Sequence, residues 1–325
     1  MSQAVSLERF GLAVGHASDE TGATGCTVIR GIRDPHRASC AVIGRATGSR
    51  ELALLEPGHL VERVDAILLA GGSAYGLDAV AGIMRWMEAR GRGFPVGSGV
   101  VPIVPAAVLF DLAPLGVPTA RPTAAMAEAA CESAVSEGIA EGSVGAGTGL
   151  TVGKIAGRDN AMKGGFGLAV TEGTGCAAVA MVAVNAFGDV RDAAGRIIAG
   201  ARTEKRSKDF ADTARIIAQG AAGPPRAFAA AAAPNTTLAV VAVDVALSKL
   251  ELQQLARSAT AAFHRRISPA GSSYDGDIVF ALAPMEGLSA PLAQAEMLVV
   301  AALEQAIERA VRLAKGRDGV PGLAD

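Results

Sequence analysis

Hydrophobic residues in this chain gather in short runs whose spacing predicts strands. The runs lie between turn-rich segments, at residues 26–29, 40–44, 66–70, 177–184, 196–199 and 278–282. Residues 238–243 form a further run, Leu-Ala-Val-Val-Ala-Val, in which polar residues do not alternate with apolar ones. Such a continuous pattern indicates a strand that is buried on both faces.

Apolar residues at helical spacing predict four helices. The first has its apolar positions between Leu77 and Met87 and ends just before Gly91, and the second begins at Thr123 and ends at Gly138. The third begins at a capping box that Ser248 opens, and the last covers residues 291–315. Strands buried on both faces call for sheets covered by helices. The spacing does not distinguish one mixed sheet from two stacked sheets.

The composition indicates an aliphatic and tightly packed interior. Of the 325 residues, 50% are hydrophobic but only 4% are aromatic, so Ala, Val, Leu and Ile must fill most of the core. The formal net charge is −2, with both signs interspersed, and no basic run with interleaved aromatic residues offers a footprint for nucleic acid. Nucleic-acid binding is therefore not expected.

The cysteines and the first residues of the chain bear on cofactors and location. Cys26, Cys40, Cys131 and Cys176 lie far apart without the CxxC spacing of a zinc or redox site. We therefore expect buried free thiols and no cofactor or metal. Residues 1–5 lack a basic segment leading into an apolar one, and no stretch supplies the ~20 apolar residues that span a bilayer. We expect a cytoplasmic protein with no membrane partner.

A glycine-rich stretch at residues 142–154 resembles a phosphate-binding loop but lacks the required spacing. A P-loop has a glycine five residues before the glycine of its Gly-Lys pair and Ser or Thr after the lysine. Here those two positions are Thr148 and Ile155, and no GxGxxG pattern fits either. We interpret the glycines as positions where the backbone passes close to another segment or to a ligand.

An abrupt change of composition precedes the apolar strand at 238–243. Residues 203–234 are first charged and then rich in alanine and proline, which is typical of a linker, and Asn235 and Thr236 follow directly. A threonine at a chain N-terminus is a nucleophile whose own α-amine, with a reference pKa near ~8, serves as base. We therefore hypothesise that the Thr236 hydroxyl attacks the Asn235 carbonyl and that hydrolysis of the ester frees the Thr236 amine.

Other catalytic arrangements have weaker support. His16 near the start of the chain could serve as a general base, whereas His264, beside two arginines, is predicted to lie on the surface. No GxSxG elbow supports a Ser-His-Asp triad, because the Gly-Gly-Ser-Ala segment ends in Tyr75. Asp275 and Asp277 alternate by two, so on an extended segment they face one side, where they could bind a cation, orient a nucleophile or simply form a turn.

Six motifs, in order along nearly the whole chain, resemble the L-aminopeptidase D-esterase/amidase family. That family includes β-peptidyl aminopeptidases and nylon-oligomer hydrolases. Each motif is weak alone, but the ordered set is specific. The motifs are residues 71–79, 142–149, 153–154 and 184–189, Asn235-Thr236-Thr237, and Asp275-Gly276-Asp277.

The resemblance implies a fold and a maturation step. The fold is a single domain, residues 1–325, built as a four-layer αββα sandwich of α/β class that is similar to the ornithine acetyltransferase fold. A precursor of this kind cleaves itself, here into associated subunits of residues 1–235 and 236–325, with the linker at 203–234 ending at the cleavage site. We also expect a homo-oligomer of the paired subunits, which the small-residue composition allows.

The resemblance also implies roles for individual residues. Thr236 becomes the nucleophile, and Tyr75 and Asn185 become residues that polarise or hold the substrate carbonyl. Lys154 falls where the nylon-oligomer hydrolases have a lysine near the nucleophile. From the residues alone, Tyr75 is equally compatible with a tyrosine at the edge of the core, Lys154 with a solvated charge and Asn185 with a turn.

The acidic pair and the identity of the nucleophile indicate which branch of the family the sequence resembles. Asp275 and Asp277 fall on the pair that orients the new N-terminus. The aminopeptidases of the family carry serine as nucleophile and a different pair at this position, so the sequence is closer to the threonine branch. The leading prediction is an amide hydrolase that acts on small peptides, amides or amide oligomers through an acyl-enzyme on Thr236. The alternatives are acyl transfer to an amine and a non-catalytic binding or assembly protein.

Overall fold

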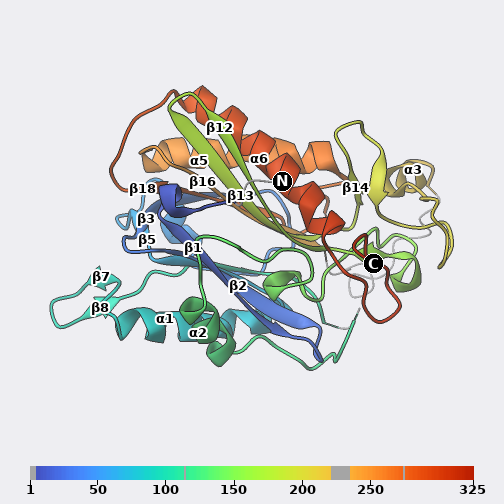
Figure 1. Ribbon diagram of the computed structural model, residues 1–325, viewed down its shortest axis with the longest axis horizontal. Coiled ribbons are helices and arrows are strands. Elements are labelled where there is room, and N and C mark those ends of the chain that lie inside the picture. The colour runs from blue at the N-terminus through green and yellow to red at the C-terminus, as the bar shows by residue number, and fades with distance from the viewer. Residues whose placement is uncertain (1–4, 113–114, 221–234, 274) are drawn as a thin grey trace.

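Two stacked sheets form the middle of the molecule, and helices cover both outer faces (Figure 1). The structure is a computed structural model that describes residues 5–112, 115–220, 235–273 and 275–325. The order of layers is helices, sheet, sheet, helices. Three apolar clusters correspond to the three interfaces between these layers. The predicted four-layer αββα sandwich is therefore confirmed.

The first sheet is built entirely from the N-terminal third of the chain. Its strand order is β1-β2-β6-β9-β4. Helices α1 and α2 pack on its outer face, and the short 3-10 helix η3 leads into α1 (Figure 1). The elements are β1 (Leu12–Asp19), β2 (Thr24–Gly31), β4 (Ser49–Arg50), β6 (Ala66–Ala70), β9 (Ala106–Val108), η3 (Ser73–Ala79), α1 (Val80–Glu88) and α2 (Ala124–Glu132).

The second sheet draws its strands from distant parts of the chain. Its order is β12-β13-β16-β18-β3-β5, in which β16 and β18 are parallel and the other neighbours are antiparallel. Helices α5 and α6 cover its outer face (Figure 1). The elements are β3 (His36–Val42), β5 (Arg63–Val64), β12 (Gly165–Gly173), β13 (Cys176–Asn185), β16 (Thr236–Val243), β18 (Ile278–Pro284), α5 (Lys249–Arg266) and α6 (Leu292–Arg312).

The unbroken apolar pattern of β16 results from burial on both faces. Alternate side chains on a strand point to opposite faces of the sheet. Accordingly Ala239, Val241 and Val243 pack in the cluster under α5 and α6, whereas Val240 and Ala242 pack in the cluster between the two sheets. All eight residues of the strand are buried. The predicted strand at 238–243 and its two-sided cover are confirmed.

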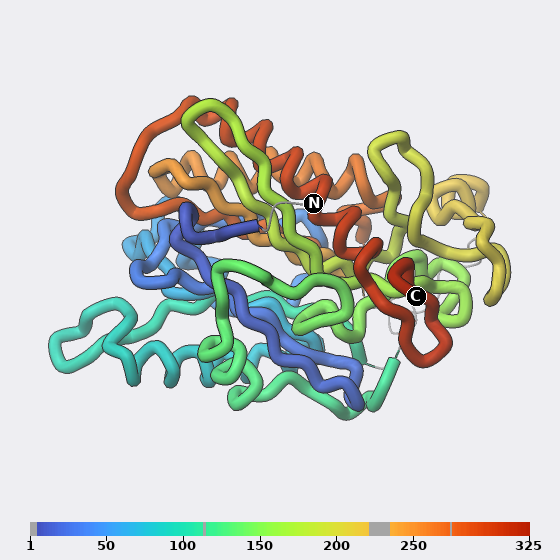
Figure 2. The backbone as a smooth tube through the Cα atoms, in the orientation of Figure 1, coloured from blue at the N-terminus to red at the C-terminus, as the bar shows by residue number. Residues whose placement is uncertain are grey.

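Smaller elements connect the layers or project from them. Figure 2 shows the hairpin of β7 and β8 extending away from the body beside α1. A two-stranded ladder, β10 and β11, and a three-stranded sheet, β15-β14-β17, lie beside the central sheets. Their bounds are β7 (Phe94–Pro95), β8 (Val100–Val101), β10 (Thr151–Val152), β11 (Met162–Lys163), β14 (Asp189–Arg191), β15 (Ile197–Ala199), β17 (Ile267–Ser268), α3 (Thr213–Ala218), η1 (Glu8–Phe10), η2 (Ala53–Leu55), η4 (Gly145–Gly147) and η5 (Arg158–Asn160).

The second helix ends earlier than predicted. Thr123 caps it as expected, since the Thr123 hydroxyl accepts a hydrogen bond from the Met126 amide, but α2 stops at Glu132 rather than Gly138. The reason is a competing interaction. Val135 exchanges backbone hydrogen bonds with Val14 on β1, an edge strand of the first sheet whose free backbone groups pair with any extended neighbour.

Several predictions concern features that the structure addresses only in part. The linker at 203–234 includes α3 within its first part, whereas residues 221–234 lie outside the described residues. No helix among the described residues is long and apolar enough to cross a membrane. The cytoplasmic location, the homo-oligomer and the division into two subunits stay predictions. The four cysteines are buried, as expected.

Candidate active site

The register of the second sheet brings three polar segments together at one end of its central strands. Asn185, the last residue of β13, lies opposite Thr236, the first residue of β16. Asn235 pairs with Asp275 in an isolated parallel bridge just before β16 and β18 begin. Parallel neighbours start at the same edge of a sheet, so the residues preceding both strands meet there. Side chains from residues 185, 235–236 and 275–277 thus share one buried region.

The Asn235–Thr236 peptide bond is held by two hydrogen bonds to the same carbonyl oxygen. The Thr236 hydroxyl donates to the Asn235 oxygen over 2.5 Å, and the Gly276 amide donates to that oxygen over 3.0 Å. Both Asn235 and Thr236 are buried. The side-chain oxygen and nitrogen of Asn235 have no hydrogen-bond partner among the described residues, which is costly for a buried amide.

The two predicted acidic residues are buried and accept backbone hydrogen bonds. Asp277 accepts from the Thr237 amide over 2.6 Å and from the Gly271 amide over 3.0 Å. Asp275 accepts from the Ser272 amide over 2.8 Å. Burial, and then the neighbouring charge of Asp275, raise the pKa of Asp277 above its usual range. The Asp277 carboxylate therefore holds the backbone just after Thr236, and the Asp275 carboxylate holds the backbone at Ser272.

Lys154 approaches the same region from the glycine-rich segment. Its ammonium nitrogen donates to the Asn185 side-chain oxygen over 2.8 Å and to the Asn185 backbone oxygen over 3.0 Å. Burial lowers the pKa of Lys154 to about 7, although the charges of Asp275 and Asp277 partly oppose this shift. A lysine amine with such a pKa can exchange a proton near neutral pH.

The Asn185 side chain is fixed at both ends of its amide. Its oxygen accepts from the Thr151 amide over 3.1 Å as well as from Lys154, and its nitrogen donates to the Phe110 carbonyl over 3.1 Å. These contacts determine which end of the amide is oxygen and which is nitrogen. The sequence motifs predicted Asn185 but neither backbone group, because every residue carries an amide and a carbonyl.

Tyr75 is exposed, whereas the other predicted residues are buried or half-buried. It is in η3 and is 63% exposed, and the Arg121 guanidinium lies 4.6 Å from the centre of its ring. Its loop reaches the site through the backbone, because the Ser73 amide donates to the Leu109 carbonyl, next to Phe110. The structure brings together Lys154, Asn185, Thr236, Asp275 and Asp277 and places Tyr75 on a neighbouring exposed loop.

The histidines that the sequence offered as alternatives take other places. His16 bonds Thr27 through Nδ1 over 2.9 Å and packs edge-on against Phe166. Burial lowers the pKa of His16 to about 4, so this histidine is neutral at ordinary pH. His264 is exposed, as predicted. Among the described residues, no group of three His, Cys, Asp or Glu side chains could hold a metal ion.

The glycine-rich segment makes close backbone contacts, as its composition indicated. A side-chain carbon at Gly149 would lie 1.9 Å from the Ala23 carbonyl oxygen, and one at Gly153 would lie 1.9 Å from the Ala201 amide. Only glycine fits such approaches. The segment thus passes against the backbone of neighbouring loops and ends at Lys154, within the site.

A cavity of about 820 Å³ lies elsewhere in the molecule. Its lining includes Arg9, Arg33, His36 and Arg63, together with residues 284–286 at the end of β18. The polar cluster around Thr236 lies at the start of that strand. None of the predicted site residues lines this cavity, so the chemistry and the large hollow are at different ends of the sheet.

Paired sheets between helical layers are the arrangement of the N-terminal-nucleophile (Ntn) hydrolase fold. A solved structure with this fold superposes on the chain. It is described as the L-aminopeptidase D-Ala-esterase/amidase from Ochrobactrum anthropi, a variant of the Ntn hydrolase fold. It superposes with a TM-score of 0.69 at 21% identity, covering 96% of this chain and 86% of that one.

Sequence comparison is more specific than the fold. The sequence model of peptidase family S58 matches residues 10–322, so this chain belongs to that family. An uncharacterized aminopeptidase of Mycobacterium leprae is 40% identical over 250 residues, which are 74% of this chain and 65% of the relative. A 6-aminohexanoate-oligomer endohydrolase of Kocuria sp. is 32% identical over 275 residues, 84% of this chain and 72% of that protein. The resemblance that the six motifs predicted is confirmed.

Proposed function

We propose that this protein is a self-processing amide hydrolase whose nucleophile is the hydroxyl of Thr236. One observation carries the proposal: the Thr236 hydroxyl and the Gly276 amide converge on the Asn235 carbonyl oxygen, at 2.5 and 3.0 Å. A hydroxyl beside a carbonyl that already receives a backbone donor has the components of an acyl transfer. Membership of a peptidase family supports the same reaction class.

The first reaction is cleavage of the chain's own Asn235–Thr236 bond. The Thr236 oxygen attacks the Asn235 carbonyl carbon, its hydroxyl proton passes to a base, and the negative charge develops on the oxygen that the Gly276 amide contacts. Collapse breaks the C–N bond, protonates the Thr236 nitrogen and leaves an ester. Water then hydrolyses the ester, so that Asn235 ends in a carboxylate and Thr236 begins with an amine.

The base for this first step is assigned to Lys154. The α-amine of Thr236 exists only after cleavage, so it cannot be the base in this step. The Lys154 amine can, because its pKa of about 7 leaves a useful neutral fraction at physiological pH. Lys154 reaches the site through Asn185, which lies opposite Thr236 in the sheet. Asp275 and Asp277 contribute negative charge that limits the fall of the lysine pKa.

The second reaction uses the same hydroxyl on a substrate amide. The new α-amine of Thr236 accepts the hydroxyl proton, the oxygen attacks the substrate carbonyl, and Asn185 donates to the developing oxyanion. The proton then passes to the departing amine, which leaves an acyl group on Thr236. Water releases this group as a carboxylate and restores the enzyme. Asp275 and Asp277 are assigned to orient the new N-terminus, since Asp277 holds the amide that follows Thr236 and Asp275 lies beside the bond that is cut.

The substrate class follows from the relatives and from the exposed loop. One relative bears the name of an aminopeptidase and another that of an endohydrolase of 6-aminohexanoate oligomers, so we assign small peptides, amides or amide oligomers to this site. Tyr75 is exposed, and its loop contacts the segment that holds Asn185. It is assigned to contact the substrate rather than the nucleophile.

Intact mass spectrometry of purified protein tests the proposal. The wild-type chain should resolve into fragments of residues 1–235 and 236–325, and Thr236→Ala should stay whole and inactive on amino-acid anilides and on 6-aminohexanoate oligomers. Thr237→Val is the matched control, because it alters the adjacent buried threonine but keeps the backbone amide that Asp277 binds. A Thr236→Ala variant that hydrolyses amides would refute the assignment. Release of acyl product only when an amine acceptor is added would point to acyl transfer instead.

A further inference from the structure

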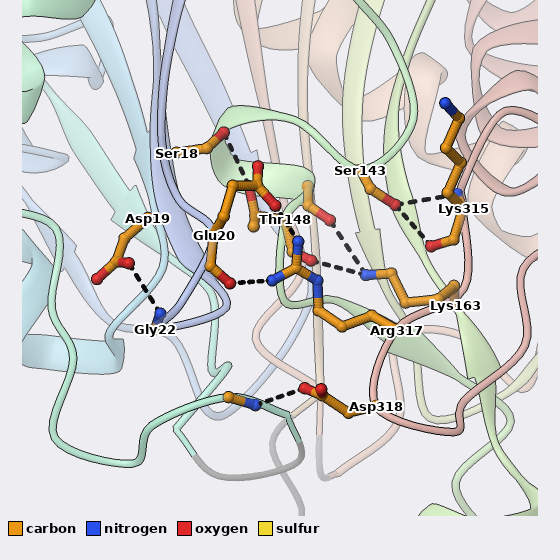
Figure 3. A network of polar contacts seen from close by, with 12 residues as sticks. Ser18, Asp19, Glu20, Gly22, Ser143, Thr148, Lys163, Lys315, Arg317 and Asp318 are labelled. Atoms are coloured by element: carbon orange, nitrogen blue, oxygen red, sulfur yellow. Dashed lines mark hydrogen bonds and ion pairs between the residues drawn. The ribbon is translucent and has the colours of Figure 1, made fainter.

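A second buried lysine, Lys163, lies outside the predicted site and is only 1% exposed. Its ammonium nitrogen donates to the carbonyl oxygens of Thr148 over 2.8 Å and Leu150 over 2.9 Å, with Gly147 at 3.5 Å. Figure 3 shows the side chain pointing at the turn that contains Thr148, beside Arg317. An ammonium group has three donors, so this arrangement matches the charged form, although burial lowers the pKa of Lys163 to about 7.

The carbonyls that Lys163 binds belong to the segment leading directly to Asn185. Leu150 is followed by Thr151, the first residue of β10, whose amide donates to the Asn185 side-chain oxygen. Thr151 is also the backbone partner of Lys163 in the β10–β11 ladder. Lys163 therefore fixes this segment through its backbone and its side chain, immediately before the amide that orients Asn185.

A buried carboxylate occupies the corresponding place on the other side of Asn185. Asp111 follows Phe110, whose carbonyl accepts from the Asn185 nitrogen. Asp111 is 2% exposed and accepts hydrogen bonds from the Thr24 hydroxyl over 2.7 Å and from the Gly72 amide over 2.6 Å. These bonds fix the segment that contains Phe110. The two charges are opposite in sign, and each shifts the pKa of the other toward the charged form.

We propose that Lys163, together with Asp111, is a positioning residue that holds the Asn185 amide in its reactive orientation. The proposal rests on two buried side chains of opposite charge. Lys163 holds the segment that ends in the Thr151 amide, and Asp111 holds the segment that contains the Phe110 carbonyl. These two backbone groups are hydrogen-bonded to the two ends of the Asn185 side-chain amide. The role in catalysis rests on the proposed function, since it is Asn185 that would donate to the oxyanion. The effect on the orientation of Asn185 does not depend on any activity.

The test combines kinetics with a direct view of the Asn185 amide. The chain contains three asparagines, Asn160, Asn185 and Asn235, so protein labelled with 15N-asparagine gives three side-chain amide signals, and Asn185→Ala identifies one of them. Lys163→Met removes all three donors at similar length. We expect it to shift the Asn185 signals and speed their exchange with solvent. Lys205→Met, which removes an exposed lysine from a surface ion pair, should leave them unchanged.

The kinetic arm asks whether Lys163 acts through Asn185. Because a misplacement of about 1 Å can cost on the order of 10²-fold in rate, Lys163→Met should lower kcat by roughly that factor with little change in KM. In an Asn185→Ala background the same change should cost much less, since residues that act as a unit are not additive. Lys163→Gln, which keeps two donors, carries the same test if the Met variant does not fold.

The outcomes separate this proposal from the proposed function. Unchanged Asn185 signals in the folded variant, or an equal loss of kcat with and without Asn185, would overturn the positioning role and leave Lys163 as a structural residue of the core. A wild-type protein that neither cleaves itself nor hydrolyses amides would overturn the proposed function. The amide signals would still decide whether Lys163 orients Asn185.

Discussion

Gly276 offers the sharpest perturbation of the site, because it lies between the two aspartates and touches both partners of the proposed cleavage. Its amide donates to the Asn235 carbonyl oxygen over 3.0 Å. A side-chain carbon built on Gly276 would lie 2.8 Å from the Thr236 hydroxyl oxygen and 2.7 Å from the Ala46 carbonyl oxygen. The Ala46 backbone cannot rotate away as a side chain would, so Gly276→Ala must displace the nucleophile, the donor, or both.

The size of the effect follows from these distances. Ordinary contact for such a carbon begins at 3.4 Å, so the Thr236 oxygen and the new carbon must separate by about 0.6 Å from the 2.8 Å that they would have. Since a misplacement of about 1 Å can cost on the order of 10²-fold, we expect cleavage to slow by at least roughly tenfold. Displacement of the Gly276 donor from the oxyanion position adds to this loss, because removing one such donor typically costs about 10²–10³-fold.

The assay follows cleavage from the moment of synthesis. Cell-free translation, quenched at intervals, supplies the intact 32.6 kDa chain at time zero, and mass spectrometry measures the fraction cut after Asn235. Gly58→Ala is the matched control, because no atom lies within 4 Å of a side-chain carbon at that position. Each variant replaces one glycine by alanine, so both have the same effect on the entropy of the unfolded chain. Wild-type cleavage rates in a folded Gly276→Ala protein would refute the placement of Gly276 against the reacting atoms.

Three further predictions concern pH and stability. With the pKa of Lys154 at about 7, cleavage should accelerate as pH rises through 7, because the neutral amine is the basic form. Lys154→Met should lose this inflection, while Lys205→Met keeps it. An unchanged pH profile in Lys154→Met would remove Lys154 from the mechanism. His16 has its pKa lowered to about 4, so the unfolded chain binds a proton that the folded chain does not as pH falls below 6.5. Denaturant unfolding should therefore show a loss between pH 6.5 and 5 that is about 1.6 kcal/mol smaller in His16→Gln than in the wild type, and an equal loss in that variant would contradict the assignment. Ser248→Ala should reduce the free energy of unfolding by about 1 kcal/mol through loss of the α5 capping box, whereas Thr260→Ala within the same helix should change it much less.

The architecture was accessible from the sequence where one pattern has one physical cause. The apolar run after Thr236 required cover on both faces, and β16 has it, because its alternate side chains pack under the helices and between the sheets. The capping box at Ser248 is local, and both of its hydrogen bonds form. The end of α2 depended on a distant strand instead, since Val135 pairs with Val14, and no local signal marks that competition.

The site also contains residues that the sequence could predict and residues that it could not. The ordered motifs predicted Lys154, Asn185, Thr236 and the acidic pair, which the structure gathers at one end of the second sheet. The Gly276 amide and the Phe110 carbonyl could not be predicted, because their roles belong to backbone groups that every residue carries. The sequence did not predict Lys163 for another reason. A lysine among small residues is typical of the protein surface, and the burial of Lys163 follows from the tertiary fold.

The position of the proposed cut explains why the two products would stay together. Asn235 lies just outside the ladder, whereas Thr236 already pairs with Asn185, so cleavage removes no rung between β13 and β16. The fragment that begins at Thr236 supplies β16, β18, α5 and α6, and these pack against β12, β13 and β3 from the other fragment. Neither fragment holds a complete second sheet, so each buries the apolar surface of the other. The buried Asn235 side chain, which has no hydrogen-bond partner among the described residues, belongs to the segment that becomes a chain end, where it is able to leave the core. Cleavage can therefore free the Thr236 amine and relieve a poorly satisfied residue while the sheet that positions the nucleophile remains intact.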